Sequence, residues 1–542
     1  MKFTTEPNVE TKINRMRSRV RWGHPSVVER QIDQTRLEIA DGHNQDVEFS
    51  FLVLGDSGTG NHRGDNPQRR VAEAMLEYEE ECRFTLHTGD VVYLVGSKEQ
   101  YPENFIRPYR VWLIGGDNPS AICYDQMVFK KPFLPVLGNH DYYDLPWWVS
   151  VASGATQPLR KLLVSRLDLD VGWHGSFQGD AFARAFFDYL QGVPEAKLAE
   201  HFDSHYTGTA PAVGEASPQS RCLCYTPGAF TRLPNRYYCF RYGGIDFFAL
   251  DSNTFNQPLP IPNTAEGRQQ RQALRQRRQD LEAERSQLLM QAAGMNGDGA
   301  EGAQKTAGGT SGDADPLPDI YTELEQLEEQ ISDIDKQLSS SGSVAVDFEQ
   351  LNWLQQQLIE SWQTPEVRGR VLLFHHPPYV TEATKWHQGQ TLAVRANLRQ
   401  VLQGVADAVG SLAEDRPLVD LVITGHAHCL EYLRTEDTGC ADRHINWLIC
   451  GGSGFSLRRQ RVEGPELREP GSSQTVARSH LFVGRTGRGS QRKRPYSFLR
   501  VDVKAGNPAQ IVLRPFVVEK HQGQWHHYAK DAIEIPMQLQ TK

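Results

Sequence analysis

The sequence predicts an α/β fold, and two observations carry this prediction. Short apolar runs alternate with stretches in which apolar residues recur at helical spacing, as in a βαβ succession. Several of the apolar runs end abruptly in a glycine that is followed by acidic, amide or histidine side chains. Open α/β sheets keep their ligand sites at the C-terminal ends of the strands. The pattern therefore predicts buried strands whose ends meet at one polar site.

Composition limits the classes of protein that the chain can belong to. Its 542 residues are enough for more than one domain, and its formal net charge of -9 disfavours non-specific binding to nucleic acid. No stretch approaches the roughly 20 apolar residues of a membrane helix, and residues 1–20 lack the apolar run of a signal peptide. The 8 cysteines are scattered. We expect a reduced, cytoplasmic protein that binds neither a membrane nor nucleic acid.

The spacing of one cysteine pair has two interpretations. Cys222 and Cys224 form a CxC pair, and Cys239 is not far away in the sequence. Buried or incidental thiols are the favoured interpretation, and a metal site or a disulfide is the minor alternative.

The core elements follow one another in the order expected of an α/β protein. Val47 marks a change from a polar, charged extension, in which a short helix over Val27 to Ile39 is expected, to strand-like sequence. An amphipathic helix over Pro67 to Glu80 separates the first two strands. The expected buried strands are Phe49 to Leu54, Arg83 to Thr88, Phe133 to Leu137, Arg370 to Phe374, Val419 to Thr424 and Asn446 to Cys450.

Two segments interrupt this core. Residues 145–235 are rich in aromatic residues and are expected to form a small helical cap, with its own aromatic core, over the site. These aromatics include Trp147, Trp148, Trp173, Phe177, Phe182, Phe186, Phe187 and Tyr189. Residues 264–340 are expected to form a coiled-coil hairpin, because apolar residues from Ile320 to Leu338 alternate in steps of 4 and 3. Its first helix is basic and its second is acidic, which favours intrachain pairing; self-association is the alternative.

The C-terminal part contains a basic region and two further strands. Arg458 to Arg494 is interpreted as a solvated basic loop, with a site for a polyanionic substrate as a minor hypothesis. Tyr496 to Val503 and Gln510 to Val518 are expected to form an antiparallel pair that completes the core. The expected division is 1–46 extension, 47–144 core, 145–235 cap, 236–263 core, 264–340 coiled coil, 341–455 core, and 456–542 basic loop and closing strands.

Five of the expected strands end in motifs that carry metal-binding side chains. In chain order these are Gly55-Asp56-Ser57-Gly58, Gly89-Asp90-Val91-Val92-Tyr93, Gly138-Asn139-His140-Asp141, His375-His376-Pro377 and Gly425-His426-Ala427-His428. Each motif alone is a common turn or surface pair, but five in order are unlikely to be coincidental. Carboxylates, an amide and imidazoles suit Mn, Fe or Zn. They exceed what one zinc needs and fit two metals about 3.5–4 Å apart that share a carboxylate.

These motifs resemble those of the calcineurin-like metallophosphoesterase superfamily, and most of all its purple acid phosphatase branch, with the pattern GDxG, GDxxY, GNH(D/E), HxP and GHxH. The resemblance implies a four-layer α-β-β-α sandwich with two metal ions at the strand ends, iron paired with iron, manganese or zinc. It assigns Asp56, Asp90, Tyr93 and His428 to one metal. It assigns Asp90, Asn139, His375 and His426 to the other, so that Asp90 bridges.

Two positions separate this chain from other branches of the superfamily. Most of its members carry a histidine ligand where Gly58 stands, and protein phosphatases carry an arginine where this chain has Tyr93-Leu94. A packed aromatic residue is the alternative interpretation of Tyr93. As a phenolate ligand it favours Fe(III), because a hard, highly charged ion lowers the pKa of the phenol.

The resemblance implies hydrolysis of phosphoesters, in which a metal-bound hydroxide attacks phosphorus in line with the leaving oxygen. His140, oriented by Asp141, is expected to bind the phosphoryl group or to protonate the leaving oxygen. His376 is a second candidate for this role, or else a packed histidine, and Asn61 and His62 are weak candidates for substrate contact. We expect a phosphomonoesterase for a phosphorylated small molecule or phosphoprotein; the alternatives are a phosphodiesterase or pyrophosphatase, and a scaffold protein with a vestigial site.

Overall fold

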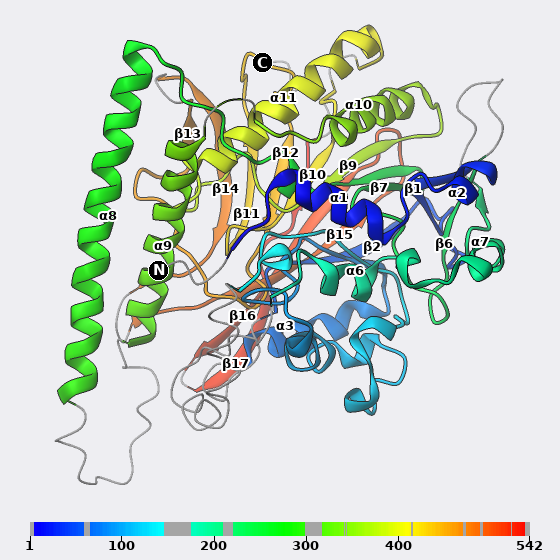
Figure 1. The fold of residues 1–542 in the computed structure, drawn as a ribbon, viewed down its shortest axis with the longest axis horizontal. Coiled ribbons are helices and arrows are strands. Elements are labelled where there is room, and N and C mark those ends of the chain that lie inside the picture. The colour runs from blue at the N-terminus through cyan, green and yellow to red at the C-terminus, as the bar shows by residue number, and fades with distance from the viewer. Residues whose placement is uncertain are drawn as a thin grey trace.

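Two β-sheets pack face to face at the centre of the molecule and helices cover their outer faces (Figure 1). The computed structural model describes residues 5–58, 66–145, 175–209, 220–298, 317–340, 342, 344–413, 416–469, 473–487, 491–521 and 523–536. The α/β class expected from the alternating pattern is confirmed.

The larger sheet has 11 strands in the order β13-β14-β11-β12-β10-β9-β8-β7-β1-β6-β5. Their bounds are β1 Ile32–Ile39, β5 Gly208–Thr209, β6 Arg221–Tyr225, β7 Tyr238–Tyr242, β8 Ile245–Ala249, β9 Gly369–Leu373, β10 Leu421–Thr424, β11 Leu430–Thr435, β12 Asn446–Cys450, β13 Glu466–Arg468 and β14 Thr475–Val483. The central strands β8, β9, β10 and β12 are parallel. Their C-terminal ends therefore lie at one edge of the sheet.

The smaller sheet has 7 strands and is built from both ends of the chain. Its strands are β2 Phe49–Leu54, β3 Cys82–His87, β4 Phe133–Pro135, β15 Tyr496–Val503, β16 Ile511–His521, β17 Gln524–Ala529 and β18 Ile533–Glu534. β2, β3 and β4 are parallel, whereas β15 pairs antiparallel with both β2 and β16. The antiparallel pair expected near the C-terminus is present, and it joins the sheet that carries the first three motifs.

The longer helices of the described chain complete the layers. They are α1 Val9–Arg19, α2 Pro25–Glu29, α3 Pro67–Glu79, α6 Asp180–Phe186, α7 Leu198–His205, α8 Ala265–Asp298, α9 Leu317–Ser339, α10 Phe348–Gln363 and α11 Gly389–Val409. α10 and α11 share a buried cluster with the outward side chains of β9 and β10, such as Leu372 and Val422. α3 covers the other sheet, where Tyr78 lies 4.3 Å from Phe516 between ring centroids. The layers are thus α-β-β-α.

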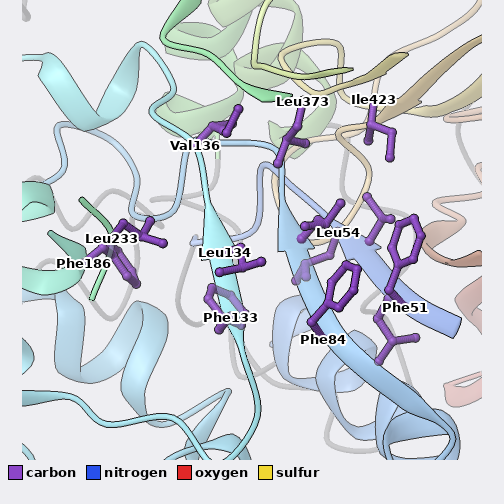
Figure 2. Packing of buried hydrophobic residues seen from close by; sticks show 14 of the residues in the cluster. Phe51, Leu54, Phe84, Phe133, Leu134, Val136, Phe186, Leu233, Leu373 and Ile423 are labelled. Atoms are coloured by element: carbon purple, nitrogen blue, oxygen red, sulfur yellow. The ribbon is translucent and has the colours of Figure 1, made fainter. Parts of the chain in front are cut away.

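Aromatic side chains dominate the core between the sheets. The Phe51 and Phe84 rings of β2 and β3 stack at 4.9 Å, and Phe247 of β8 meets the Phe84 ring edge-on at 5.5 Å. Figure 2 shows Phe51, Leu54 and Phe84 from one sheet, with Leu373 and Ile423 of the other sheet lying close by. Neighbouring residues of β9, Leu372 and Leu373, belong to clusters on opposite faces of the larger sheet, so its near-continuous apolar run reflects burial on both faces.

The N-terminal segment corrects an expectation. A short helix was expected over Val27 to Ile39, but most of that range is strand β1, which lies in the larger sheet between β6 and β7. The segment does not look like a buried strand because it contains polar residues such as Gln34. This side chain is buried nonetheless, and its nitrogen donates to the Val20 carbonyl at 2.8 Å. A polar side chain can be buried when it has a hydrogen-bond partner, and a search for apolar runs misses a strand that contains one.

The expected helical cap is also different in its described part. α6 and α7 are present, but β5 and β6 belong to the larger sheet: β6 pairs with β1, and β5 pairs with β6. Phe182, Phe186 and Phe187 join the main core between the sheets rather than forming a separate one. Trp147, Trp148 and Trp173 lie outside the described residues.

The basic region is not a continuous loop. β14 pairs antiparallel with β11, and β13 pairs with β14, so these strands extend the larger sheet. Arg458 and Arg485 are buried rather than solvated. The expectation of a solvated loop was wrong for these parts because β11 offers an open edge that the local sequence does not show.

α8 and α9 form an antiparallel helical hairpin beside the sheets, with α9 between α8 and the body of the molecule (Figure 1). Leu281 of α8 packs with Leu327, Ile331 and Ile334 of α9. Arg278 Nε lies 2.7 Å from Asp335 Oδ1. This ion pair joins the basic first helix to the acidic second helix. Within the described chain, no helix has the length and apolar character needed to cross a membrane.

We expect the core between the sheets to be the main source of stability. Phe84→Ala should lower the free energy of unfolding by about 3–5 kcal/mol, because it leaves a cavity among stacked rings. Denaturant unfolding followed by fluorescence measures this loss. Phe348→Ala is the control, since Phe348 is 56% exposed, and it should change stability by less than about 0.5 kcal/mol. Equal effects of the two substitutions would contradict this account of the core.

Candidate metal centre

The two sheets place the expected metal-binding side chains in one buried cluster. The strands β2, β3, β4, β9 and β10 each end beside this cluster. The residues delivered there are Asp56, Asp90, Tyr93, Asn139, His375, His426 and His428, all of them buried. Side-chain donor atoms of Asp56, Asp90 and His375 lie within 4.8 Å of one another. Side chains far apart in the sequence therefore converge as the strand-end motifs predict.

One set of donor atoms surrounds the Asn139 amide oxygen. Asn139 Oδ1 lies 3.0 Å from His375 Nε2 and 3.0 Å from His426 Nδ1. His375 Nε2 also lies 3.3 Å from Asp90 Oδ2. These four atoms are the donors that the family resemblance assigns to one metal.

A second set surrounds the Tyr93 hydroxyl. This hydroxyl donates to Asp56 Oδ1 at 3.0 Å and Asp90 Oδ2 at 2.7 Å, and lies 3.3 Å from His428 Nε2. His428 Nε2 is 3.6 Å from Asp56 Oδ1. Asp90 Oδ2 thus belongs to both sets. The geometry suits a carboxylate shared between two cations.

Glycines allow the loops that carry these residues to approach one another. A Cβ atom on Gly58 would lie 1.9 Å from the Val91 carbonyl oxygen, and one on Gly138 would lie 2.1 Å from Asp90 Oδ1. Position 58 therefore has no room for a side chain in this arrangement. The φ angles of Asp56 and Asp90 are 52° and 54°, in the left-handed region that non-glycine residues seldom adopt. Such backbone conformations concentrate at functional sites.

The carboxylates of this cluster perturb one another. Burial raises the pKa of Asp56 well above its ordinary value, and the negative charge of Asp90 adds to this rise. Burial opposes ionisation of Asp90 too, but the positive charges of His375 and His140 hold its pKa below the ordinary range. Burial lowers the pKa of His375, yet the Asp90 carboxylate outweighs it and raises this pKa to about 9. Buried anionic oxygens that lack a full set of cations fit divalent metal ions.

Backbone carbonyl groups fix two of the imidazole rings. His375 Nδ1 bonds to the Thr88 carbonyl at 2.8 Å, and His428 Nδ1 bonds to the Ser456 carbonyl at 2.9 Å. Each ring therefore directs Nδ1 to a carbonyl oxygen and turns Nε2 to the cluster. Hydrogen bonds of this kind set the tautomer and the orientation of metal-binding histidines.

The catalytic candidate His140 lies beside the second donor set. Its ring centroid is 4.3 Å from that of Tyr93, and its side chain is partly exposed. The ring is held by the Leu94 carbonyl, which lies 2.6 Å from His140 Nδ1. The backbone N–H of His140 donates to Asp90 Oδ1 at 2.8 Å. His140 thus positions the shared carboxylate as well as presenting an imidazole.

Asp141 does not orient His140, and this corrects the sequence-based expectation. Its carboxylate accepts backbone N–H groups of Gly138, Asp90 and Val91 at 2.9, 3.0 and 3.2 Å. These bonds tie the Asn139 loop to the Asp90 loop. The Leu94 carbonyl oxygen, rather than the Asp141 carboxylate, is the hydrogen-bond partner of His140 Nδ1.

His376 is engaged on both ring nitrogens. Nδ1 lies 2.8 Å from Ser252 Oγ, and Nε2 accepts from Asn256 Nδ2 at 3.1 Å. The side chain is fully buried, with its ring 4.5 Å from that of His426. The arrangement favours the packed role over proton transfer. Asn61 and His62 lie outside the described residues.

Phe455 and Lys385 at the cluster have no counterpart in the sequence-based predictions, whereas Arg458 begins the basic region for which a polyanion site was the minor hypothesis. Phe455 stacks on Tyr93 with centroids 3.9 Å apart and planes 5° apart. Lys385 Nζ lies 3.1 Å from His426 Nε2, and the backbone N–H of Arg458 donates to the His428 carbonyl at 2.9 Å. The glycine-rich end of β12 was a signal for Phe455. No motif marks Lys385.

Comparisons with known proteins add only a weak likeness. A scan of protein-family models and a search of curated proteins both find no match. Among solved structures, GAP50, the anchor in the inner membrane complex of Plasmodium, is 13% identical with a TM-score of 0.36, over 91% of this chain and 90% of that chain. Purple acid phosphatase PPD1 from yellow lupin (Lupinus luteus) seeds is 11% identical with a TM-score of 0.40, over 90% and 54%.

A third structure, PhoD, is 11% identical with a TM-score of 0.34, over 89% of this chain and 71% of that chain. This chain therefore matches little more than half of the lupin phosphatase. Likenesses at this level carry no argument about activity, which must come from the geometry of the cluster.

We expect Asp141 to stabilise the fold rather than to tune His140. Asp141→Ala leaves three buried backbone N–H groups without an acceptor, and should lower the free energy of unfolding by about 3 kcal/mol or more. Denaturant unfolding tests this value. Asp117→Ala, at an exposed position, is the control and should cost less than about 0.5 kcal/mol. An Asp141→Ala protein as stable as this control would contradict the assignment.

Proposed function

We propose that this chain is a dinuclear-metal-dependent phosphoester hydrolase that acts on phosphomonoesters. The observation that carries the proposal is the shared position of Asp90 Oδ2, 2.7 Å from the Tyr93 hydroxyl and 3.3 Å from His375 Nε2. One carboxylate oxygen common to two sets of nitrogen and oxygen donors is the arrangement that two-metal hydrolases need. A phosphorylated small molecule or a phosphoprotein is the proposed substrate.

Asp56, Asp90, Tyr93 and His428 would hold one metal ion, and Asp90, Asn139, His375 and His426 the other. When bound, the two ions would activate water and neutralise charge on phosphoryl oxygens. Iron with iron, manganese or zinc suits this mixture of carboxylate, phenol and imidazole. Burial and the Asp56 and Asp90 carboxylates raise the pKa of Tyr93, and a highly charged cation reverses that effect.

The chain's own residues orient the substrate and handle the leaving group. His140 Nδ1 is held by the Leu94 carbonyl, which leaves Nε2 for an incoming phosphoryl group or leaving oxygen. The Asp141 carboxylate keeps the loops of Asn139 and Asp90 in register by accepting the N–H groups of Asp90 and Val91. Phe455 covers the face of Tyr93 and limits contact of this ring with water. The attacking and leaving oxygens thus meet a preorganised surface.

Removal of the shared carboxylate tests the proposal. Asp90→Asn should lower bound metal, measured by elemental analysis, and should lower turnover more than about 100-fold, since loss of an outer hydrogen-bond partner to a metal ligand alone costs about 10–100-fold. The assay should include a phosphomonoester, a bis-ester, pyrophosphate and cyclic nucleotides, which separates a phosphomonoesterase from a phosphodiesterase or pyrophosphatase.

Asp246→Asn serves as the matched control, because Asp246 pairs with Arg241 away from the cluster. It should retain metal and turnover. A wild-type chain that hydrolyses none of these esters, or a biological role that survives Asp90→Asn, would favour a scaffold protein with a vestigial site.

Tyr93 offers a spectroscopic test of the proposed iron. The metal-loaded protein should show a visible charge-transfer band, and Tyr93→Phe should lose it because no phenolate remains. Tyr238→Phe removes another buried tyrosine hydroxyl and should keep the band. Absorption spectra of the wild type and the two variants test the iron–phenolate assignment. A colourless protein with full activity would refute the iron–phenolate assignment.

A further inference from the structure

Helix α9 has two faces with different roles. Its apolar face, which includes Leu327 and Ile331, packs on α8. Residues of its polar face contact the body of the molecule next to the metal-binding cluster. These are Glu329, Asp333, Lys336 and Gln337. The spacing of this set places it along one side of the helix.

The polar face is held by specific hydrogen bonds and ion pairs. Asp333 Oδ2 accepts the backbone N–H of Gly389, at the start of α11, at 3.0 Å. Lys336 Nζ lies 2.6 Å from Glu6 Oε2, and Glu6 Oε1 lies 2.6 Å from Lys12 Nζ. The hairpin is therefore docked in a defined register against both α11 and the N-terminal segment.

Glu329 is the residue of this face that reaches the cluster. Its carboxylate pairs with the Lys385 ammonium and lies 3.9 Å from Arg458 Nη2. The two cationic residues are 1% and 2% exposed. Lys385 Nζ in turn lies 3.1 Å from His426 Nε2. A carboxylate from a remote hairpin thus contacts two buried basic side chains directly behind a metal-binding histidine.

The position of these cations relative to His426 limits what they can bind. His426 turns Nδ1 to Asn139 and Nε2 to Lys385, so the imidazole ring separates the ammonium group from the donor atoms. A phosphoryl group at the donor atoms would not occupy the place of the Glu329 carboxylate. Lysine and arginine side chains are well suited to bind phosphate or carboxylate oxygens.

We propose that Lys385 and Arg458 form an anion subsite for a second anionic group of the substrate, and that Glu329 of α9 occupies this subsite until the substrate displaces it. Glu382, a second buried carboxylate influenced by the Arg458 charge, accepts a hydrogen bond from the Thr384 hydroxyl at 2.8 Å. The inference deepens the proposed function, since it assigns a substrate class: phosphoesters that carry a further phosphate or carboxylate.

Two phosphonates that differ by one carboxylate test the subsite. We would titrate the full-length protein, with its metals, with 3-phosphonopropionate and with propylphosphonate, and measure affinity by calorimetry. Glu329→Gln should bind 3-phosphonopropionate about tenfold more tightly than the wild type, because the competing carboxylate is gone. Its affinity for propylphosphonate should change less than about twofold. Lys385→Met should weaken binding of 3-phosphonopropionate much more than binding of propylphosphonate.

Glu328→Gln is the matched control, since Glu328 pairs with Arg285 of α8 at 3.3 Å and not with the cluster. It should leave both affinities unchanged, and thermal melting should show both glutamine variants folded. Equal binding of 3-phosphonopropionate by wild type and Glu329→Gln, or no binding by either, would overturn the subsite. Phosphonates are not hydrolysed, so an inactive protein that shows the expected differences would refute only the hydrolase assignment.

Discussion

The structure depends on holding two carboxylates, those of Asp56 and Asp90, side by side in the protein interior. Burial of like charges is costly unless cations or hydrogen bonds compensate for lost water. The Tyr93 hydroxyl bonds to both groups, and the His426 backbone N–H donates to Asp56 Oδ2 at 3.0 Å. Close loop approach at Gly58 makes this possible. The surrounding strands, glycines and backbone bonds all keep this pair in place.

Much of this arrangement was predictable because its signals are local. A strand buried on both faces is a continuous apolar run, and its end is marked by glycine and polar residues, as at β2 and β10. Topology then brings the ends of parallel strands to one edge. Asp56 and His426 were found in this way. The α3 helix was equally clear, since it begins at Pro67 after the capping residue Asn66.

The remainder depended on contacts between distant residues, which no local pattern records. β1 contains Gln34, a polar residue that a buried strand is not expected to hold. Gln34 can be buried because its side chain donates a hydrogen bond to the Val20 carbonyl. Asp141 has the right chemistry to orient an imidazole, but residue type does not reveal which hydrogen-bond acceptor lies nearest to His140 Nδ1. Lys385 and Glu329 are 56 positions apart and on separate elements, so neither stands out from the many charged residues of the chain.

The pairing of β2 with β15 has a consequence for biosynthesis. Leu52 lies opposite Arg500 in this antiparallel ladder, so one side of the strand that precedes Asp56 stays unpaired until a segment far along the chain has been made. Until then its backbone N–H and C=O groups form an open edge, which invites unwanted pairing with other chains. A nascent chain that stalls or is cleaved before Tyr496 would therefore expose the unpaired edge of an apolar strand, which chaperones and proteases recognise.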